Sequence, residues 1–529
     1  MTDTSMPLTN TVKRIIIVGG GTAGWLTACH LGHKLQQDGN LNQEIILIES
    51  PNIPTIGVGE GTVPSIVASL NKLGIKEADL IQCADATFKQ SVKFVDWKKK
   101  ESNESHYYHH VFDHPNSDKE ALIRQWVSNK NINNSFVDMI SNQGQVCDQH
   151  LAPKLITTPE FKGAMGYAYH FDAIKLAGLL TKHATSKFNV KHIKSELVDT
   201  KFSDNGYIRS ITLKNKQALD ADLFIDCTGF SSLLLGEKLQ VEFIDKQSIL
   251  FTDRAITTQI PTNSLLNSIP SCTLATAKSA GWIWDIGLSN RRGIGYVYSS
   301  SHTSKQQAQD DFLSYLRPSL SQKIEDVEFR EIEFKVGYRK FAWSKNCVAI
   351  GLSQGFVEPL EATKILMIDD AAKALCELLP THVNQYEIAA KKYNKIIRYQ
   401  WDRIIDFIKL HYYLSDRDDN DFWRQNKQHD TMPESLLEML TLWDTRIPSE
   451  YDFSSRHEVF YRINYLYILY GMGKRPKNLV FNDKQSAEIE RKIIEIEKNL
   501  LLQREYLFNQ LESNNLLINK IKKYGLQRI

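Results

Sequence analysis

A glycine-rich turn directly after an apolar run constrains the fold of this chain more than any other feature. The strand-like run 14–18 leads into Gly-Gly-Gly-Thr-Ala-Gly at 19–24, which matches G-x-G-x-x-G. In a dinucleotide-binding βαβ unit these glycines give a tight turn, close backbone approach to a pyrophosphate and close helix-on-strand packing. We expect a helix over 23–36 whose first amides face the phosphates. The cofactor-binding candidates in this turn are Gly19, Gly21, Thr22, Ala23 and Gly24.

A second apolar run supports this interpretation. Residues 45–48 end in Glu49, which lies 25 residues after Gly24. An acidic residue near this spacing meets a ribose hydroxyl in dinucleotide-binding folds. The pair of features favours a bound dinucleotide over a glycine turn without a ligand.

Composition limits the number of modules and the kinds of partner. The chain has 529 residues, more than one core usually holds, so we expect two or three modules. Its 64 basic and 62 acidic residues give no reason to expect nucleic acid or an anionic membrane as a partner. Seven scattered cysteines without C-x-x-C indicate buried thiols in a reducing compartment. We see neither a signal-like apolar region nor an 18-residue apolar stretch, and therefore expect a cytoplasmic protein.

The remaining pattern predicts an α/β chain. We expect a helix over 165–187, alternating strands over 190–224, a β-rich region over 245–300 and mainly helices from 369 onward. The last segment, 486–523, predicts a helical hairpin packed on the body; a coiled-coil partner surface is the alternative, and a homodimer is left open. We therefore predict a nucleotide-binding module interleaved with β-rich elements over 1–375 and a mainly helical module over 376–529.

A second strand ends in glycine at 346–353. In flavoproteins with two dinucleotide motifs, such a late strand reaches the flavin and the next helix points its N-terminus at the ring, which makes Gly351 a cofactor candidate. The same residues also read G-x-S-x-G, the nucleophile elbow of α/β-hydrolases, with Ser353 as the nucleophile. The elbow needs a helix directly after the serine, and Pro359 disfavours one there.

Several further segments occur together in one known family. Residues 54–65, 168–173, 281–286, 356–361 and 411–423 match it in order, within a resemblance that runs from about 14 to 475. The chain thereby resembles flavin-dependent halogenases of the tryptophan-halogenase family. The run 54–65 resembles the strap that covers the flavin, and 281–286 resembles the W-x-W-x-I-P signature, with Gly287 in place of proline.

The resemblance implies a fold and an activity. The fold is an FAD-binding, Rossmann-like box with a β-rich substrate sheet and a C-terminal helical module. The activity uses FADH2 from a separate flavin reductase, O2 and a halide ion to make hypohalous acid. This oxidant passes through a tunnel lined by Trp282 and Trp284 to Lys89 and halogenates an aromatic small molecule beside Glu361. By resemblance, further cofactor residues are Val58, Gly59, Glu60 and Leu360, and the halide residues are Thr363 and Lys364.

These residue types suit electrophilic halogenation. A buried ammonium polarises the leaving oxygen of hypohalous acid, and a free amine can carry the halogen. A nearby carboxylate stabilises the cationic ring and accepts its proton. In a strand, Lys89 and Lys93 would share a face, and only the motif match favours Lys89. The structural alternatives are a solvated lysine at 89 and, for Glu361, a carboxylate that stabilises a helix N-terminus.

The sequence departs from the family pattern at two places. Lys364 stands where family members carry glycine, so its side chain either attracts a halide or blocks the site. On the substrate side, the glutamate that grips an amino acid has no clear counterpart in 451–461. An aromatic sandwich of His109, Phe112 and Phe460 would stack on a flat ring. We therefore expect an indole or a phenol rather than free tryptophan.

Three alternatives complete the reading. The first is a flavin-dependent aromatic monooxygenase of the same fold, which would oxygenate the ring directly and would not need Lys89. The second is an inactive flavin-binding relative. The histidines His106, His109, His110 and His114 have a spacing that could ligate zinc. Their aromatic neighbours favour packing instead, and no metal is predicted.

Overall fold

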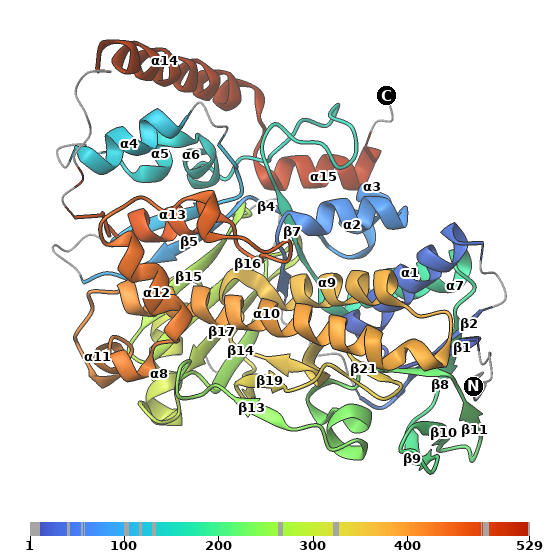
Figure 1. Cartoon of the computed structure of the whole chain (residues 1–529). Helices are drawn as coiled ribbons and strands as arrows, with labels where there is room; N and C mark the ends of the chain where they lie inside the picture. The colour runs from blue at the N-terminus through green and yellow to red at the C-terminus, as the bar shows by residue number, and fades with distance from the viewer. Residues whose placement is uncertain are drawn as a thin grey trace, which may run out of the picture.

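The computed structural model describes residues 11–39, 43–53, 57, 59–99, 105–115, 119–129, 134–262, 268–320, 327–477, 479 and 486–526. A six-stranded sheet forms the nucleotide-binding part, in the order β20-β21-β12-β1-β2-β8 (Figure 1). Its neighbouring strands pair in parallel from β21 to β8, and only β20 is antiparallel. The strands are β1 (Arg14–Val18), β2 (Glu44–Glu49), β8 (Lys191–Lys194), β12 (Leu223–Asp226), β20 (Trp343–Ser344) and β21 (Cys347–Ala349).

Both faces of this sheet are buried, which explains why β1 and β2 are continuous apolar runs. Ile15 and Ile17 of β1 face the main core, where α1 (Thr22–Gln37) packs. Ile16 and Val18 face a smaller core under a three-stranded sheet of β9 (Leu197–Phe202), β10 (Ile208–Leu213) and β11 (Ala218–Asp220). The predicted βαβ unit is confirmed, with α1 within one residue of its expected bounds.

Helices from distant parts of the chain pack against α1. They are α7 (Ala173–Lys187) and α9 (Thr363–Leu378), and α9 also contacts α2 (Ser65–Leu73) and the long helix α10 (Tyr386–Leu414). Figure 1 shows α10 running along α9 across the body of the molecule. The N-terminus of α9 is thereby held beside the glycine turn.

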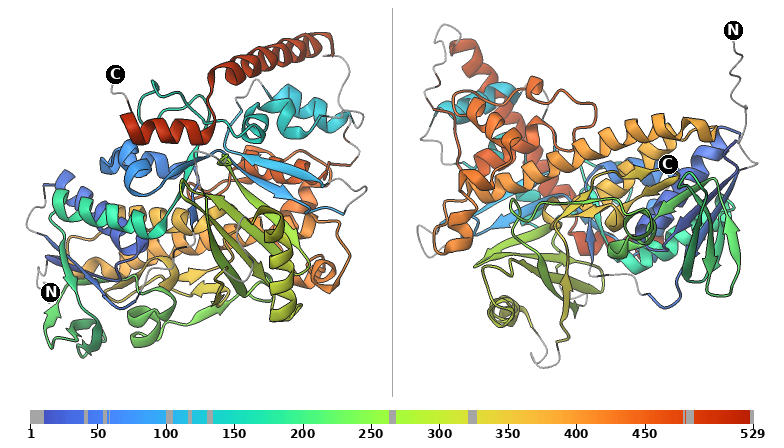
Figure 2. Two further views of the ribbon diagram at one scale, coloured as in Figure 1. Left: turned by 180° about the vertical axis from the view of Figure 1, so that it is seen from behind. Right: turned by 60° about the horizontal axis from the view of Figure 1, so that its bottom comes forward.

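A seven-stranded, mostly antiparallel sheet forms the β-rich part (Figure 2). Its order is β18-β14-β17-β16-β15-β5-β6, and only β15 and β5 pair in parallel. The strands are β5 (Ser91–Val95), β6 (Tyr107–Val111), β14 (Arg254–Pro261), β15 (Cys272–Lys278), β16 (Gly281–Gly287), β17 (Arg291–Tyr298) and β18 (Arg330–Glu333). Helix α8 (Lys305–Leu316) packs on β14 and β17.

Smaller elements connect the two large sheets. Strands β3 (Glu60–Gly61), β7 (Ala168–Phe171) and β4 (Thr87–Lys89) form one three-stranded sheet, and β13 (Phe243–Asp245), β19 (Gly337–Arg339) and β22 (Gly355–Phe356) form another. The short helices between them are α3 (Glu77–Cys83), α4 (Glu120–Ser128), α5 (Phe136–Ile140) and α6 (Gln143–Asp148).

The C-terminal third is helical, as predicted. It contains α11 (Asp421–Gln425), α12 (Glu434–Trp443), α13 (Arg462–Gly471), α14 (Ser486–Gln510) and α15 (Asn514–Tyr524). Helix α14 contacts α4, and α15 contacts α3 and β4, so the final pair packs on the body. Six of the seven cysteines are buried and all are free; Cys83 is exposed. Among the described residues, no helix is both long and apolar enough to cross a membrane.

Two local expectations are wrong. The single helix expected over 165–187 is strand β7 followed by helix α7. Asp172 begins the helix, because its side chain accepts hydrogen bonds from the amides of Ile174 and Lys175. Lys89 and Lys93 also do not share a face: they lie on separate strands, with Lys89 fully buried and Lys93 paired with Asp148.

Candidate functional site

A cavity of about 560 Å³ lies at the carboxyl ends of β1, β2 and β12. This edge is where open parallel sheets bind nucleotides. The predicted residues that line it are Gly19, Gly21, Thr22, Ala23, Glu49 and Glu60. Gly24 lies beneath this cavity, where it allows helix α1 to pack closely on the strands. Val58 lies outside the described residues.

The glycines fit a dinucleotide in separate ways. A Cβ on Gly19, which has a φ of +118°, would meet Cys227 O at 2.1 Å, and one on Gly24 would meet Gly19 O at 1.9 Å. A Cβ on Gly21 would meet nothing within 4 Å. Gly21 also caps α1 without a side-chain hydrogen bond. The turn therefore leaves open space in front of the free amides of α1, as a bound pyrophosphate requires.

A second cavity, of about 110 Å³, adjoins the first. Glu60, Phe230, Leu352 and Lys364 line both. The second cavity also brings together Lys89, Trp282, Trp284, Gly59, Leu360 and Glu361. Gly351 does not line either cavity, although its neighbour Leu352 does. Residues that the sequence places up to 305 positions apart, Gly59 and Lys364, thus meet around one space.

Lys89 is fully buried on this second cavity. Its ammonium donates a hydrogen bond to Thr62 O at 3.0 Å and lies 5.2 Å from the centre of the Phe112 ring. Burial lowers the pKa of Lys89 to about 8, against an opposing effect of the Glu361 charge. Both the ammonium and the free amine of Lys89 are therefore accessible near neutral pH.

The carboxylate of Glu361 is held by two histidines. His110 Nδ1 lies 2.8 Å and His411 Nε2 3.1 Å from Glu361 Oε1. Burial raises the pKa of Glu361, but the charges and hydrogen bonds of His110 and His411 outweigh it and bring the pKa to about 2. His411 Nδ1 also lies 2.7 Å from Phe407 O, so both of its ring nitrogens face acceptors. Glu361 is thus a buried anion.

The turn before α9 aims this carboxylate. Glu361 and Ala362 both have left-handed backbones, with φ of 67° and 58°. Such a conformation costs a non-glycine residue about 1–2 kcal/mol. The strain is local to the point where the main chain enters α9 and Glu361 turns toward His110. Strain at this point is consistent with a functional site.

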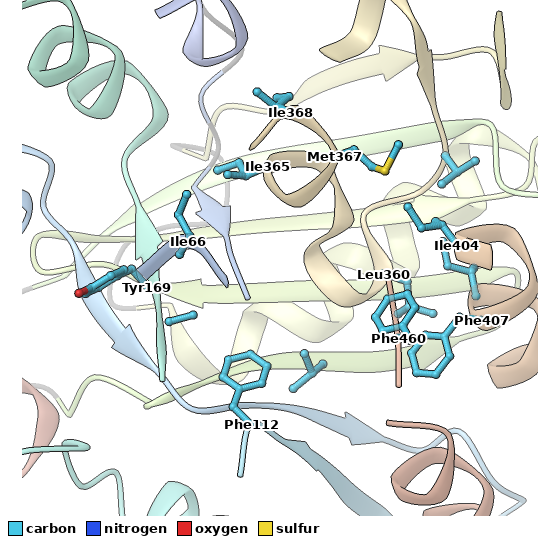
Figure 3. Packing of buried hydrophobic residues seen from close by; sticks show 14 of the residues in the cluster. Ile66, Phe112, Tyr169, Leu360, Ile365, Met367, Ile368, Ile404, Phe407 and Phe460 are labelled. Atoms are coloured by element: carbon cyan, nitrogen blue, oxygen red, sulfur yellow. The ribbon is translucent and has the colours of Figure 1, made fainter. Parts of the chain in front are cut away.

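A third cavity, of about 670 Å³, lies on the other side of Glu361. Phe112, Phe460 and His110 line it, and Phe460 stacks on Phe407 with ring centres 3.8 Å apart. Figure 3 shows Phe112 and Phe460 on different segments of the chain, with Phe460 beside Leu360 and Phe407. Glu361 lines both this cavity and the Lys89 cavity. The Lys89 cavity therefore lies between the nucleotide cavity and the aromatic cavity.

The expected role of His109 in this pocket is wrong. His109 points away from the cavity, with its ring nitrogens 3.0 Å from Ser91 Oγ and 3.1 Å from Asp148 Oδ1. Its neighbour His110 lies on the cavity instead, because side chains alternate along β6. These two histidines bind different carboxylates, which separates the proposed zinc ligands. No group of three or more metal-ligating side chains occurs in the part of the chain that the structure describes.

Thr363 and Lys364 begin α9 beside the first two cavities. Lys364 lines both, and a small cavity of about 20 Å³ reaches Thr363 and Lys364 from another side. Lys364 Nζ forms an ion pair with Glu60 Oε1 at 2.5 Å. The charge of Lys364, the residue that stands in place of the family's glycine, is therefore paired with that of Glu60.

The serine-nucleophile alternative is wrong. The Ser353 hydroxyl is buried and donates to the main-chain oxygens of Asp226 and Ile350. The residues after it form strand β22 rather than the helix of a nucleophile elbow. Ser353 instead ties β12 to β21.

Sequence reasoning assigned no role beside Lys89 or Glu361 to four site residues. They are His110, His411, Glu358 and Tyr412. Glu358 is fully buried and accepts hydrogen bonds from Trp282 Nε1 at 3.2 Å and from the Tyr412 hydroxyl. Glu358 and Glu361 flank Pro359-Leu360 in the motif already noted, so a second buried carboxylate could have been suspected there. His411 and Tyr412 lie in the matching segment 411–423 and His110 lies in the histidine cluster, but neither pattern indicates which glutamate each residue contacts.

Comparisons with known proteins agree with this geometry. The model of the tryptophan halogenase family matches residues 14–485. A tryptophan 6-halogenase from Streptomyces toxytricini is 32% identical over 507 residues, covering 91% of this chain and 94% of that protein. The crystal structure of a tryptophan halogenase from Shewanella frigidimarina superposes with a TM-score of 0.93 at 37% identity, covering 98% and 99% of the two chains.

A further structure extends the comparison beyond enzymes described as tryptophan halogenases. A flavin-dependent halogenase from Brevundimonas superposes with a TM-score of 0.83 at 29% identity, covering 96% of this chain and 99% of that one. The family match spans the glycine turn, Lys89, the two tryptophans and Glu361. The chain therefore belongs to the tryptophan halogenase family and is a flavin-dependent halogenase.

Proposed function

We propose that this chain halogenates an electron-rich aromatic small molecule of the indole or phenol type, using FADH2 supplied by a separate flavin reductase. Bound FADH2 would supply, with O2, the oxidising power that converts a halide into hypohalous acid. Gly21 and the amides of α1 would hold the pyrophosphate, and Glu49 the ribose. Thr363 and Lys364 would place the halide near the ring at the start of α9.

The observation that carries this proposal is the position of Lys89. It is fully buried on a cavity that adjoins the nucleotide cavity on one side and, through Glu361, the aromatic cavity on the other. Free hypohalous acid reacts indiscriminately, so an enclosed passage is needed. Trp282 and Trp284 would wall that passage, since both are buried on the Lys89 cavity.

At the end of the passage, Lys89 would present halogen to the ring. An ammonium donates a hydrogen bond to the leaving oxygen, and a free amine takes the halogen and transfers it. Glu361 would stabilise the cationic ring, because it is a buried anion beside the aromatic cavity. The cationic ring is a far stronger acid than a carboxylic acid, so Glu361 would accept its proton despite this low pKa, and His110 would hold Glu361 in place.

The aromatic cavity supports a flat substrate. Phe112 and the stacked Phe460 offer ring faces, and His110 replaces His109 in the proposed sandwich. We propose an indole or a phenol without the charged amino-acid part. A matched panel would test this directly: tryptophan, indole, 3-methylindole and simple phenols.

The experiment is turnover with FAD, a flavin reductase, NADH and bromide or chloride, read by mass spectrometry. Halogen isotope patterns in the product support the proposal. Hydroxylated product alone would instead favour the monooxygenase reading, and tryptophan as the best substrate would overturn the substrate assignment. Lys89→Ala separates the two oxidative readings, because only halogenation needs the amine.

A further inference from the structure

An ion pair marks the junction between the nucleotide cavity and the Lys89 cavity. Lys364 Nζ and Glu60 Oε1 are 2.5 Å apart, and their side chains are 23% and 12% exposed. Both residues line both cavities. Glu60 comes from β3 and Lys364 from the first turn of α9, so the pair joins two elements that the sequence separates by about 300 residues.

The charges at this junction decide how readily an anion enters. Screening by salt is weak for groups that are mostly buried. A lone Glu60 carboxylate would repel an anion near the start of α9, whereas a lone Lys364 would attract one. A lysine in the first turn of a helix is itself unfavourable to the helix dipole. The close ion pair with Glu60 offsets this unfavourable interaction of Lys364 with the dipole.

Space for a small ion exists beside the pair. The cavity of about 20 Å³ borders Thr363 and Lys364, and it is lined mainly by apolar side chains and glycines. A volume of this size holds one water-sized occupant. In such surroundings, the nearest charges dominate the affinity for an ion.

We propose that Glu60 and Lys364 form a charge-compensated pair that sets the affinity for the halide. Glu60 opposes halide entry, and Lys364 cancels that opposition. The Lys364 side chain is then a specificity-determining group that acts through Glu60, while its main-chain amide remains free for the ion. This inference rests on the proposed halide chemistry, and it explains how a lysine replaces the family glycine without blocking the site.

The test is a double-mutant cycle read by bromide binding rather than by turnover. Bromide NMR line broadening is measured on FAD-loaded wild type, Glu60→Gln, Lys364→Met and the double variant. Lys364→Met leaves Glu60 uncompensated and should weaken bromide binding about tenfold. Glu60→Gln should tighten it about threefold, and the double variant should return to within about twofold of wild type.

A matched control uses an ion pair elsewhere. Lys340 and Glu242 lie 2.8 Å apart on the surface, and Lys340→Met with Glu242→Gln should leave bromide binding unchanged. Because Glu60 and Lys364 also line the nucleotide cavity, FAD affinity is measured for every variant by flavin fluorescence, and bromide binding is compared only at saturating FAD.

The outcomes separate the two proposals. A double variant as weak as Lys364→Met, tighter binding by Lys364→Met, or a wild type that binds no bromide would each overturn the inference. If bromide affinities follow the expected order but the wild type makes no halogenated product, the inference stands and the proposed reaction fails.

Discussion

His110 Nδ1 lies 2.8 Å from Glu361 Oε1, and Asn464 Nδ2 lies 2.9 Å from His110 Nε2. The two ring nitrogens of His110 are therefore both engaged, one by Glu361 and the other by Asn464. The two contacts connect β6, the turn before α9 and α13. The carboxylate beside the aromatic cavity therefore has a fixed orientation.

Replacing His110 should impair turnover much more than replacing its neighbour. His110→Ala removes a hydrogen bond from Glu361 and leaves the buried anion less stabilised, which should lower kcat/KM at least about tenfold. His109→Ala serves as the matched control, because His109 contacts Ser91 and Asp148 away from the cavity. Steady-state rates of both variants on the preferred substrate check this. Equal losses would contradict the assignment of His110.

The pH dependence of turnover should report which form of Lys89 works. Burial lowers the pKa of Lys89 to about 8, so the ammonium dominates below that pH and the amine above it. If the ammonium polarises hypohalous acid, kcat should fall as pH rises through about 8. Product formation between pH 6 and 10, with reductase in excess, measures this. A rise through the same range would assign the amine instead.

Burial of the Lys89 ammonium should also lower the free energy of unfolding. Its folded pKa is below the ordinary value of 10.5, so below about pH 8 both states are protonated and the burial penalty is fully present. The penalty is relieved as pH rises from about 8 toward 10.5, because the folded state releases its proton first. Lys89→Met should therefore be inactive yet more stable at pH 7, by up to about 3 kcal/mol. Urea unfolding at pH 7 and pH 10 checks this, and the gain should shrink at the higher pH.

The sequence predicts the elements of the site better than its side-chain partners. The glycine turn, Lys89 and Glu361 lie in motifs whose local pattern is informative. The choice between His109 and His110 depends on which face of β6 meets the cavity, and a shift of one residue reverses it. The helix expected over 165–187 begins with a strand because Tyr167, Tyr169 and Phe171 alternate into the core before Asp172 caps α7. The pairing of Lys364 with Glu60 crosses about 300 residues and has no local signal.

Gly21 offers the sharpest test of the nucleotide cavity. A Cβ there meets nothing within 4 Å of the protein, so Gly21→Val should fold with little loss of thermal stability. The new side chain would nevertheless occupy space that a pyrophosphate needs, and FAD affinity should fall at least about tenfold. Gly178→Ala is the matched control: a Cβ there is equally unobstructed, but the residue lies exposed on α7, away from the cavity. Flavin fluorescence titration of both variants measures the effect, and an unchanged affinity in Gly21→Val would place the cofactor elsewhere.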